Sequence, residues 1–479
     1  MTEKQSMPAA RLAAVLLTTV VAGCTVGPDY RPPSASVSEA WIGPAANGEV
    51  DAAWWTRFDD PLLSQLVSSA VAGNKDLAEA SARLREARAA RDATYGRAEP
   101  QAGASAAVTR NRLSENGLLP VGRVPGLGPD LSLYDIGFDA SWELDLWGGT
   151  RRAIEGADAR AQAAEEAHRA VVIQVIAEVV RSYIALRSAQ GLRDNAIKNA
   201  EIQTALARLV ADRARAGSAS RFDVARAEAL ARSSAASVPR FESDATAAAF
   251  RIALLLGQPP EALYDRLRAS GSLPQPVVEV GAGLRSDLLR RRPDIRQAER
   301  ELAASTADIG VATAELFPHL SLLGGSGLQS RTPGDLLSAD SLRFQFGPSL
   351  HWPIFSGGRI RAQIRAADAR ADAAMARYER AVLAALSDTE TALNQYASAG
   401  EARAERDAAR SAAAEAVTLA RTRYLAGEDD LTALLLAQAE YNAAEQQSIQ
   451  ALATQLQNVA ALYKALGGGW EAVEASTPS

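Results

Sequence analysis

Residues that could carry catalysis or bind a metal ion are few and scattered. The sequence has one cysteine and three histidines, and the histidines show no metal-ligand spacing: Cys24; His168, His319 and His351. We interpret His168, which lies among small residues of a helical run, as a packed or tunnel-facing ring. The glycine pairs at 148–149 and 357–358 lack the Walker pattern and fit strand-to-helix corners better. We therefore expect no enzyme activity, no metal site and no cofactor.

A second group of ionisable residues forms a regular pattern. From Tyr134 to Leu146, apolar residues alternate with polar ones. The apolar set is Tyr134, Ile136, Phe138, Ala140, Trp142, Leu144 and Leu146; the polar set is Asp135, Gly137, Asp139, Ser141, Glu143 and Asp145. A period of two predicts a β-strand with one apolar and one polar face, as in membrane barrels. As a hypothesis, the carboxylates Asp135, Asp139, Glu143 and Asp145 line a barrel lumen and bias it towards cations.

Three further strands are expected. Ala102 to Arg110 would pair with the first strand, and the link from Asn111 to Asp130, rich in Gly, Pro and Leu, fits an external loop. The other two run from Leu320 to Leu328 and from Arg343 to Trp352, the latter alternating again. A soluble sheet would alternate too, so alternation alone leaves both interpretations open. If the strands do lie in lipid, four cannot close a barrel, and several chains must share one.

The first 23 residues are expected to be a lipoprotein signal peptide. Lys4 and Arg11 precede a short apolar run, Leu12 to Ala22, which ends at Gly23-Cys24. This pattern resembles the lipobox of bacterial lipoproteins. The resemblance implies cleavage before Cys24 and covalent lipid on that residue; the alternative is an ordinary signal peptide with a buried cysteine. Residues 24–60 would then be an extended, lipid-anchored segment.

Two tight reversals share Arg-x-x-x-Gly-x-x-Ser/Asp. They are Arg213 to Ser220 and Arg423 to Asp430. Gly217 and Gly427 can supply the left-handed conformation that ends a helix, and Ser220 and Asp430 can cap the next one. Local structure explains the repeated arginine less well, so we interpret both turns as exposed docking sites for a partner.

Long helices lead into both reversals. In the run from Gly358 to Ala426, small and apolar residues step by three and four, which predicts one helix roughly 100 Å long. Ile154-Glu-Gly-Ala-Asp-Ala-Arg160 matches Ile364-Arg-Ala-Ala-Asp-Ala-Arg370 at an offset of 210 residues, and Pro100 matches Pro318 at 218. We therefore predict two internal repeats, 61–270 and 271–469, before a tail at 470–479. The predicted elements are hairpins at about 101–147 and 319–356, long helices at about 150–216 and 358–426, returning helices at about 220–257 and 431–466, and a helix at about 293–316. A first helix should begin at Pro61, capped by Asp60, and run towards Gly96.

Several motifs together resemble one known family. They are Cys24-Thr-Val-Gly-Pro-Asp-Tyr30, Trp54-Trp-x-x-Phe58-x-Asp-Pro-x-Leu63, Tyr134 to Trp147, Arg291-Arg-Pro-Asp-Ile-Arg296 with Ala298-Glu299, and Ile309-Gly-Val-Ala followed by Phe317-Pro318. From Cys24 to about Gly469 the chain resembles the NodT-type outer-membrane efflux lipoproteins, which are TolC-like outer-membrane factors of tripartite efflux systems.

The resemblance implies a mainly α fold with a membrane β part. In a homotrimer, four strands per chain would share a 12-stranded barrel that continues into a long α-helical tunnel. The partners would be a periplasmic adaptor, an inner-membrane pump of the RND type and outer-membrane lipid. The chain would be a passive exit duct for drugs or other small molecules, anchored in the bacterial outer membrane with its tunnel in the periplasm.

The resemblance also assigns roles to single residues. The adaptor-contact motif matches Arg213, Gly217, Ser220, Arg423, Gly427 and Asp430. Asp223 matches an aspartate of the closed periplasmic aperture, and Tyr424 a tyrosine of the network that holds the tip shut. Ala433 and Leu436 stand where relatives often have Asp. Glu428 and Asp429 could restore negative charge at the aperture, or could be a solvated helix cap.

Two other functions stay open at the level of sequence. The same duct could serve type I protein or peptide secretion, or the chain could be a periplasmic coiled-coil scaffold without a pore. A scaffold would not need the alternation from Tyr134 to Leu146. The 479 residues carry a net charge of −6, which argues against nucleic-acid binding.

Overall fold

The computed structural model describes residues 25–34, 38, 40–44, 48–114, 128–275 and 280–476. The expected signal peptide, Cys24 and most of the expected external loop lie outside these residues. The described chain divides into two compact units. The strand unit comprises 25–33, 85–163 and 298–378, and the hairpin unit comprises the described residues of 34–84, 164–297 and 379–476.

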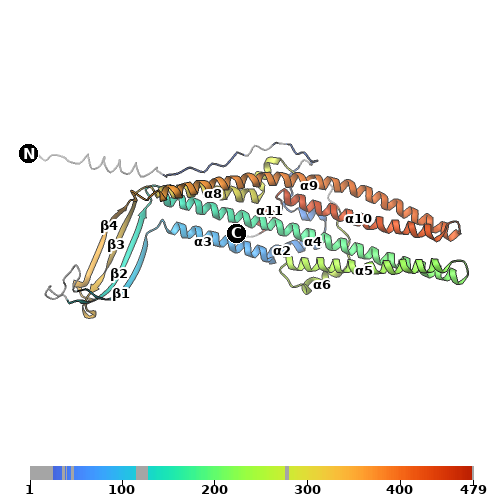
Figure 1. Cartoon of the computed structure of the whole chain (residues 1–479), viewed down its shortest axis with the longest axis horizontal. Helices are drawn as coiled ribbons and strands as arrows, with labels where there is room; N and C mark the ends of the chain where they lie inside the picture. The colour runs from blue at the N-terminus through green and yellow to red at the C-terminus, as the bar shows by residue number, and fades with distance from the viewer. Residues whose placement is uncertain are drawn as a thin grey trace, which may run out of the picture. The chain divides into compact units, whose positions relative to one another are not determined.

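Four antiparallel strands form one sheet in the strand unit, in the order β1-β2-β3-β4. They are β1 (Gln101–Arg112), β2 (Asp130–Leu144), β3 (His319–Ser330) and β4 (Leu342–His351). Figure 1 shows them side by side. Gly137 of β2 pairs with Gly327 of β3, and Ser326 of β3 pairs with Phe344 of β4. Because β1 and β4 are the outer strands of this order, each leaves one edge of backbone groups without a strand partner in the described chain.

Helices make up most of the remainder. Four helices supply residues to both units: α3 (Lys75–Gly96), α4 (Gly149–Arg215), α8 (Pro293–Ala314) and α9 (Arg359–Ala426). The small and apolar residues that recur every three or four positions in α9 include buried ones: Ile360, Ala367 and Ala385 are almost inaccessible to solvent. In the strand unit, Ala159 of α4 packs with Ala303 and Ala304 of α8. Small residues at such contacts let helices approach closely.

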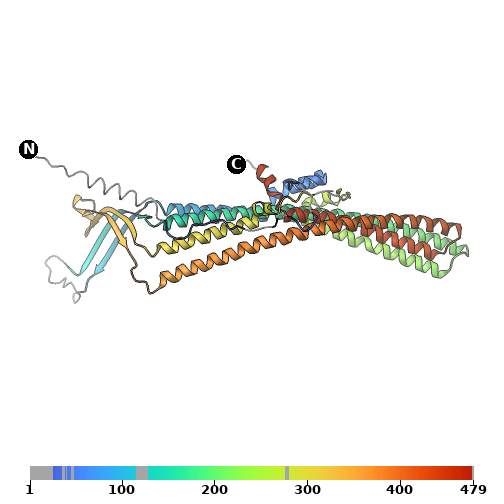
Figure 2. The same cartoon turned by 90° about the horizontal axis from the view of Figure 1, so that it is seen from above.

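The hairpin unit is built on two helical hairpins. Helix α5 (Arg221–Leu255) returns along α4, and α10 (Leu431–Ala465) returns along α9 (Figures 1 and 2). Its shorter elements are η1 (Trp54–Phe58), α2 (Pro61–Gly73), α6 (Glu261–Arg268), η3 (Arg285–Asp287), α7 (Leu288–Arg291) and α11 (Trp470–Ser476). Two further short 3-10 turns, η4 (Pro333–Asp335) and η5 (Ala339–Ser341), connect β3 to β4 in the strand unit.

One expectation about the first helix is wrong. The sequence predicts a helix from Pro61 towards Gly96, but the structure breaks it at Asn74 into α2 and α3. The Asn74 side chain accepts from the Leu77 amide at 3.0 Å and donates to the Leu255 carbonyl at 2.8 Å. Asn74 therefore caps α3 and ties it to the end of α5.

Two segments are more ordered than expected. Trp54–Phe58, placed in an extended segment by the sequence analysis, forms a buried 3-10 turn, with Trp54 stacked on Tyr463 at 5.0 Å between ring centroids. In the expected tail, Trp470–Ser476 is helix α11. Arg169 holds it through an ion pair with Glu474 and a cation–π contact with Trp470. Contacts of aromatic side chains order both segments.

Candidate functional site

The two reversals have the same backbone geometry. Gly217 and Gly427 have φ values of 80° and 78°. The Gly217 and Ser218 amides donate to the carbonyls of Ala214 and Arg213, at 3.0 and 2.9 Å. In the second turn, the equivalent bonds run from Gly427 to Tyr424 and from Glu428 to Arg423, at 3.2 and 3.0 Å. This is a Schellman motif, which explains the glycine at this position. The arginine contributes only its backbone carbonyl, which any residue could supply, so the motif does not explain the repeated arginine.

The arginine side chains are held differently in the two turns. The guanidinium carbon of Arg213 lies 4.4 Å from the centroid of the Tyr424 ring. Arg423 instead pairs with Asp429, at 2.8 Å between Nε and Oδ2, and its Nε lies 4.0 Å from Glu428. The structure thus brings Arg213 together with Tyr424, and Arg423 with Asp429. The aperture candidates Glu428 and Asp429 are part of the second turn itself.

The returning helices begin with different caps. Ser220 and Asp223 form a capping box at the start of α5: the Asp223 amide donates to Ser220 Oγ at 3.1 Å, and the Ser220 amide donates to Asp223 Oδ2 at 3.0 Å. The Ser220 hydroxyl also donates to Asp223 Oδ2, at 2.7 Å. This bond, followed by that from the Ser220 amide, lowers the pKa of Asp223. In α10, Asp430 accepts from the Ala433 amide at 3.0 Å. Alanine at 433 leaves this second cap without its acidic half.

A small apolar cluster lies beneath the turns. Tyr424 is 5 % exposed and packs with Val210 of α4 and with Leu434 and Leu435 of α10. Arg226 of α5 also donates to Thr432 Oγ1 at 3.1 Å, joining the two returning helices. Sequence reasoning missed this pair, because the repeat offset places Leu436 and Phe222 at the matching positions (226 + 210 and 432 − 210).

The four carboxylates predicted to line the lumen, on or just after β2, do not share partners. Asp135 receives a two-pronged bond from Arg343 of β4, at 2.6 and 3.0 Å, and a third bond from Gln329. Glu143 lies 2.7 Å from His319, whereas Asp145 follows the strand and accepts from the Thr150 and Arg151 amides at the start of α4. Among the described residues, Asp139 has no hydrogen-bond or ion-pair partner. The four candidates therefore do not form one cluster, and Asp139 is the one whose side chain has no partner in the described chain.

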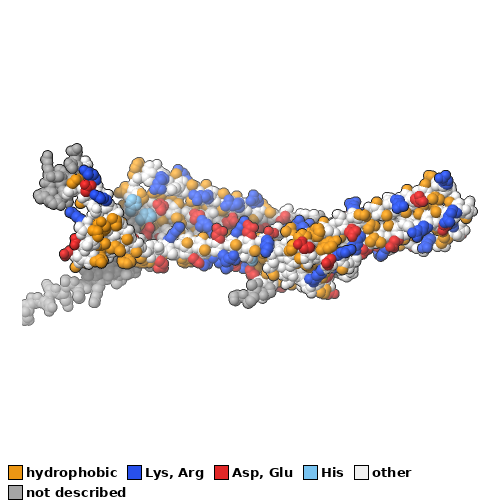
Figure 3. Space-filling view, turned by 90° about the horizontal axis from the view of Figure 1, so that it is seen from below, with side chains coloured by type: hydrophobic (Ala, Val, Ile, Leu, Met, Phe, Trp, Pro, Cys, Tyr) orange, Lys and Arg blue, Asp and Glu red, His pale blue; other side chains and the backbone are white. Residues whose placement is uncertain are grey.

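The side chains on the opposite face of the sheet from these carboxylates form an apolar surface. Figure 3 shows hydrophobic side chains gathered over the strands. The large exposed ones include Val108, Ile136, Phe138, Trp142, Leu342, Phe344, Phe346 and Leu350. Phe344 and Phe346 are 69 % and 80 % exposed. An apolar surface of this kind on a sheet indicates contact with lipid or with another protein.

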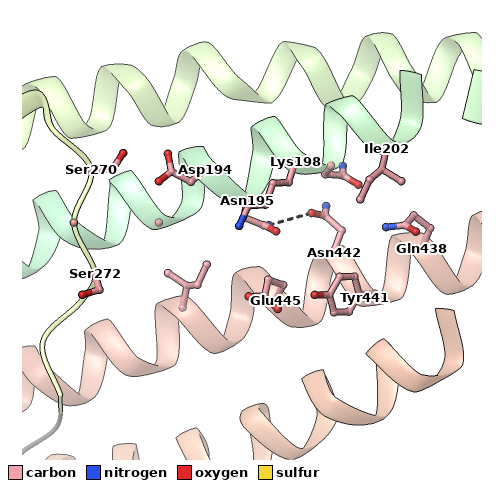
Figure 4. Close-up of a pocket in the computed structure, with 14 residues that line it drawn as sticks. Asp194, Asn195, Lys198, Ile202, Ser270, Ser272, Gln438, Tyr441, Asn442 and Glu445 are labelled. Carbon is pink, nitrogen blue, oxygen red and sulfur yellow. Dashed lines mark hydrogen bonds between the residues drawn. The ribbon is translucent and has the colours of Figure 1, made fainter. Parts of the chain in front are cut away.

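A polar cavity of about 480 Å³ lies in the hairpin unit (Figure 4). Helix α4 contributes Asn195 and Lys198, helix α10 contributes Tyr441 and Asn442, and the segment 270–272 completes the lining. Asn195 donates to Asn442 across it at 3.1 Å. Amide and hydroxyl groups suit water and small polar solutes, and this set contains no nucleophile paired with a base.

Two features are absent from the part of the chain that the structure describes. No group of three or more His, Cys, Asp or Glu side chains there could hold a metal ion. No helix in the described part of the chain is both long and apolar enough to cross a membrane.

The paired turns and the amphipathic sheet can be compared with known proteins. The sequence model described as "Outer membrane efflux protein" matches residues 66–258 and 284–468, which is most of the chain. This chain belongs to that family. The efflux protein is therefore the outer-membrane channel component of a tripartite efflux pump. The resemblance to NodT-type outer-membrane efflux proteins, inferred from its motifs, is confirmed. The family consists of channel and transport proteins.

Individual relatives agree over nearly the whole length. The efflux protein is 34% identical to the pyoverdine export outer membrane protein OpmQ of Pseudomonas aeruginosa, over 87% of each chain. It is 32% identical to nodulation protein T of Rhizobium leguminosarum bv. viciae, over 98% of this chain and 95% of the other. The solved outer-membrane channel OprN is 39% identical, with a TM-score of 0.85 over 94% of this chain and all of that one. The mainly helical fold, with four strands in the described residues, is thus that of TolC-like channels.

Proposed function

We propose that three copies of the efflux protein form one duct. The four strands of each copy would close a shared 12-stranded barrel, and the long helices would form the periplasmic tunnel. The open edges of β1 and β4 support this assembly, because unpaired backbone groups cannot face lipid. The exposed apolar side chains on the sheet give the barrel a lipid-facing surface.

We propose that the chain also carries two internal repeats. The two segments matched by the family model begin 218 residues apart (284 − 66) and end 210 apart (468 − 258). These are the offsets found between the two halves of the sequence. The matching bonds in the two turns, at Arg213 and Arg423, support the same origin.

The tip turns are proposed to contact a periplasmic adaptor, which connects the duct to an inner-membrane pump of the RND type. Large apolar side chains are exposed around both turns: Phe222 is 71 % exposed, and Leu425 and Leu436 are each 55 % exposed. Exposed apolar side chains next to rigid, glycine-closed turns suit docking of a partner helix. Opening would be an iris-like movement of the tips, and the energy would come from the pump.

The transported molecules are proposed to be small. The relative named for pyoverdine export handles a small molecule, which favours this class over polypeptide cargo. Lipid on Cys24 is proposed to anchor each copy in the outer membrane. The observation that carries the duct is that the apolar face of this open-edged, four-stranded sheet is exposed, since a soluble protein would bury that face and a scaffold would not need it.

Complementation of an efflux-deficient strain tests the docking role. The double variant Gly217→Val, Gly427→Val strains both turns, because a β-branched residue disfavours positive φ. It should abolish drug resistance while the trimer persists in the outer membrane. Gly400→Ala is the matched control, because Gly400 lies inside α9 and a Cβ there would meet only Gln455 Nε2, at an ordinary contact distance of 3.5 Å. Full resistance in the double variant would refute the docking assignment.

A further inference from the structure

Tryptophans mark the boundary between strands and helices in the strand unit. Trp142 donates to the Ala98 carbonyl at 2.8 Å, Trp147 to Pro318 at 2.9 Å, and Trp352 to Leu316 at 3.1 Å. Trp147 also stacks on Phe317, with 4.7 Å between ring centroids. Amphipathic rings concentrate where a membrane meets water. In the proposed barrel, these three tryptophans, the aromatic belt, would lie at the periplasmic interface of the membrane.

The first described residues lie against this boundary. The Val26 amide donates to the Trp147 carbonyl at 3.0 Å. Thr25 packs against Gly148, where a Cβ would lie only 2.6 Å from Thr25 Cγ2. Gly27 is equally close to Gly310, since a Cβ on Gly27 would collide with the Gly310 backbone. Residues 25–27 therefore pack closely against Trp147, Gly148 and Gly310, next to the aromatic belt. We call this packing site the seat.

One buried arginine holds the segment in that seat. Arg152, on the first turn of α4, is 4 % exposed. Its guanidinium donates to the carbonyls of Val26 and Gly27, at 3.2 and 3.4 Å, and to the Asp29 carboxylate at 2.5 Å. A planar fork of donors suits several acceptors at once, which an ammonium group could not match.

A second contact fixes the far end of the segment. The Tyr30 hydroxyl donates to Glu299 of α8 at 2.9 Å, and the Arg300 guanidinium lies 5.6 Å from its ring centroid. Burial of the ring, followed by the bond to Glu299, raises the pKa of Tyr30. The six residues from Thr25 to Tyr30 are therefore tied down at both ends.

We infer that Arg152 is a positioning residue for the membrane anchor. It seats residues 25–30 so that the acyl group on the preceding residue enters the bilayer at the level of the aromatic belt. The inference rests on the proposed lipidation of Cys24 for the acyl group, but not for the seat. The anchor would thereby be held in register with the barrel, rather than being a free tether.

Hydrogen exchange in the full-length protein, reconstituted in phospholipid vesicles, tests the seat. Arg152→Gln should speed exchange of the peptide covering 25–31 by about tenfold or more, since it removes several charge-assisted bonds. Arg152→Lys should give an intermediate rate. Arg151→Gln is the matched control, because Arg151 pairs with Asp145 and contacts none of these residues. Unchanged exchange in Arg152→Gln would overturn the inference.

A nitroxide at Pro28→Cys reports the level of the anchor. In a protein with no other change, the nitroxide should give the spectrum of an immobilised label. Its depth should be narrowly distributed just outside the membrane. Arg152→Gln should make it mobile with a broad depth, and Arg151→Gln should not. A mobile label in the parent would contradict the seat.

Lipidation is read separately by intact mass. A parent without acyl groups but with slow exchange at 25–31 would remove the lipid proposal and the anchoring role, and leave the seat. An acylated parent with fast exchange there would remove the seat and leave lipidation. Cys24→Ser should keep exchange slow, because none of the seat contacts involves the lipid.

Discussion

The guanidinium of Arg213 lies over the ring of Tyr424, 4.4 Å from its centroid, and so connects the turns of the two hairpins. Arg213 is the shared arginine of the first turn, whereas Tyr424 fills a variable position of the second. The first turn is fixed to the second through an aromatic face, whereas Arg423 stays within its own turn by pairing with Asp429. This asymmetry gives the tip a link that can be tested with single substitutions.

Tyr424→Phe should leave the tip unchanged, and Tyr424→Ala should loosen it. The cation–π contact, worth roughly 0.5–1 kcal/mol when exposed, needs only the ring. Alanine also removes a buried side chain from the cluster with Val210 and Leu434, at a cost of about 3–5 kcal/mol. The measurement is single-channel conductance in planar bilayers, with Arg213→Ala expected to lie between the two. Equal conductance in all three variants would exclude this contact as part of the closure.

The cap of α5 should resist mild acid. The pKa of Asp223 is lowered by its bonds with Ser220, so the stability that they contribute is present above the ordinary value of 3.8 and is lost as the pH falls through the lower folded value. Hydrogen exchange at 220–226, corrected for intrinsic rates, should therefore stay slow from pH 7 to 5. Ser220→Ala should speed it at every pH, while Ser233→Ala, on the exposed side of α5, should not. Loss of protection already at pH 5 in the parent would contradict this cap.

The break between α2 and α3 should not tolerate a methyl group. A Cβ at Gly73 would lie 2.5 Å from the Leu256 carbonyl, so Gly73→Ala should destabilise the hairpin unit by about 1–3 kcal/mol. Gly96→Ala is the control, because no atom lies within 4 Å of its Cβ position. Thermal unfolding in detergent, followed by circular dichroism, compares the two. A Gly73→Ala protein as stable as Gly96→Ala would show that the helix ends can separate at little cost.

Charge selectivity should depend on Asp139 more than on its neighbours. Arg343 compensates Asp135, so Arg343→Gln should release a negative charge and increase cation preference. Asp139→Asn should decrease it. Reversal potentials in a KCl gradient measure both changes. Anion preference in the parent would contradict the cation hypothesis, and a null effect of Arg343→Gln would contradict the compensation.

Periodic and local features could be predicted from the sequence, because backbone geometry alone determines them. The alternation from Tyr134 to Leu144 marks β2, and the two glycines mark the turns. Contacts between distant segments could not be predicted. Arg213 with Tyr424, Asn74 with Leu255 and Arg152 with Asp29 each depend on which helices pack together, and no period in the sequence records that. Three of the four carboxylates predicted for the lumen have partners that a single-strand pattern does not show, and one of the three, Asp145, lies beyond the end of β2.

Electron microscopy of the detergent-extracted mature protein tests the central claim, that several copies share one duct. The account predicts threefold particles with a short membrane cylinder and a helical tunnel on the order of 100 Å, the length that the rise per residue gives for α9. Each copy should contribute four strands to the cylinder. Elongated particles without a cylinder, or monomers with a free sheet edge, would contradict it.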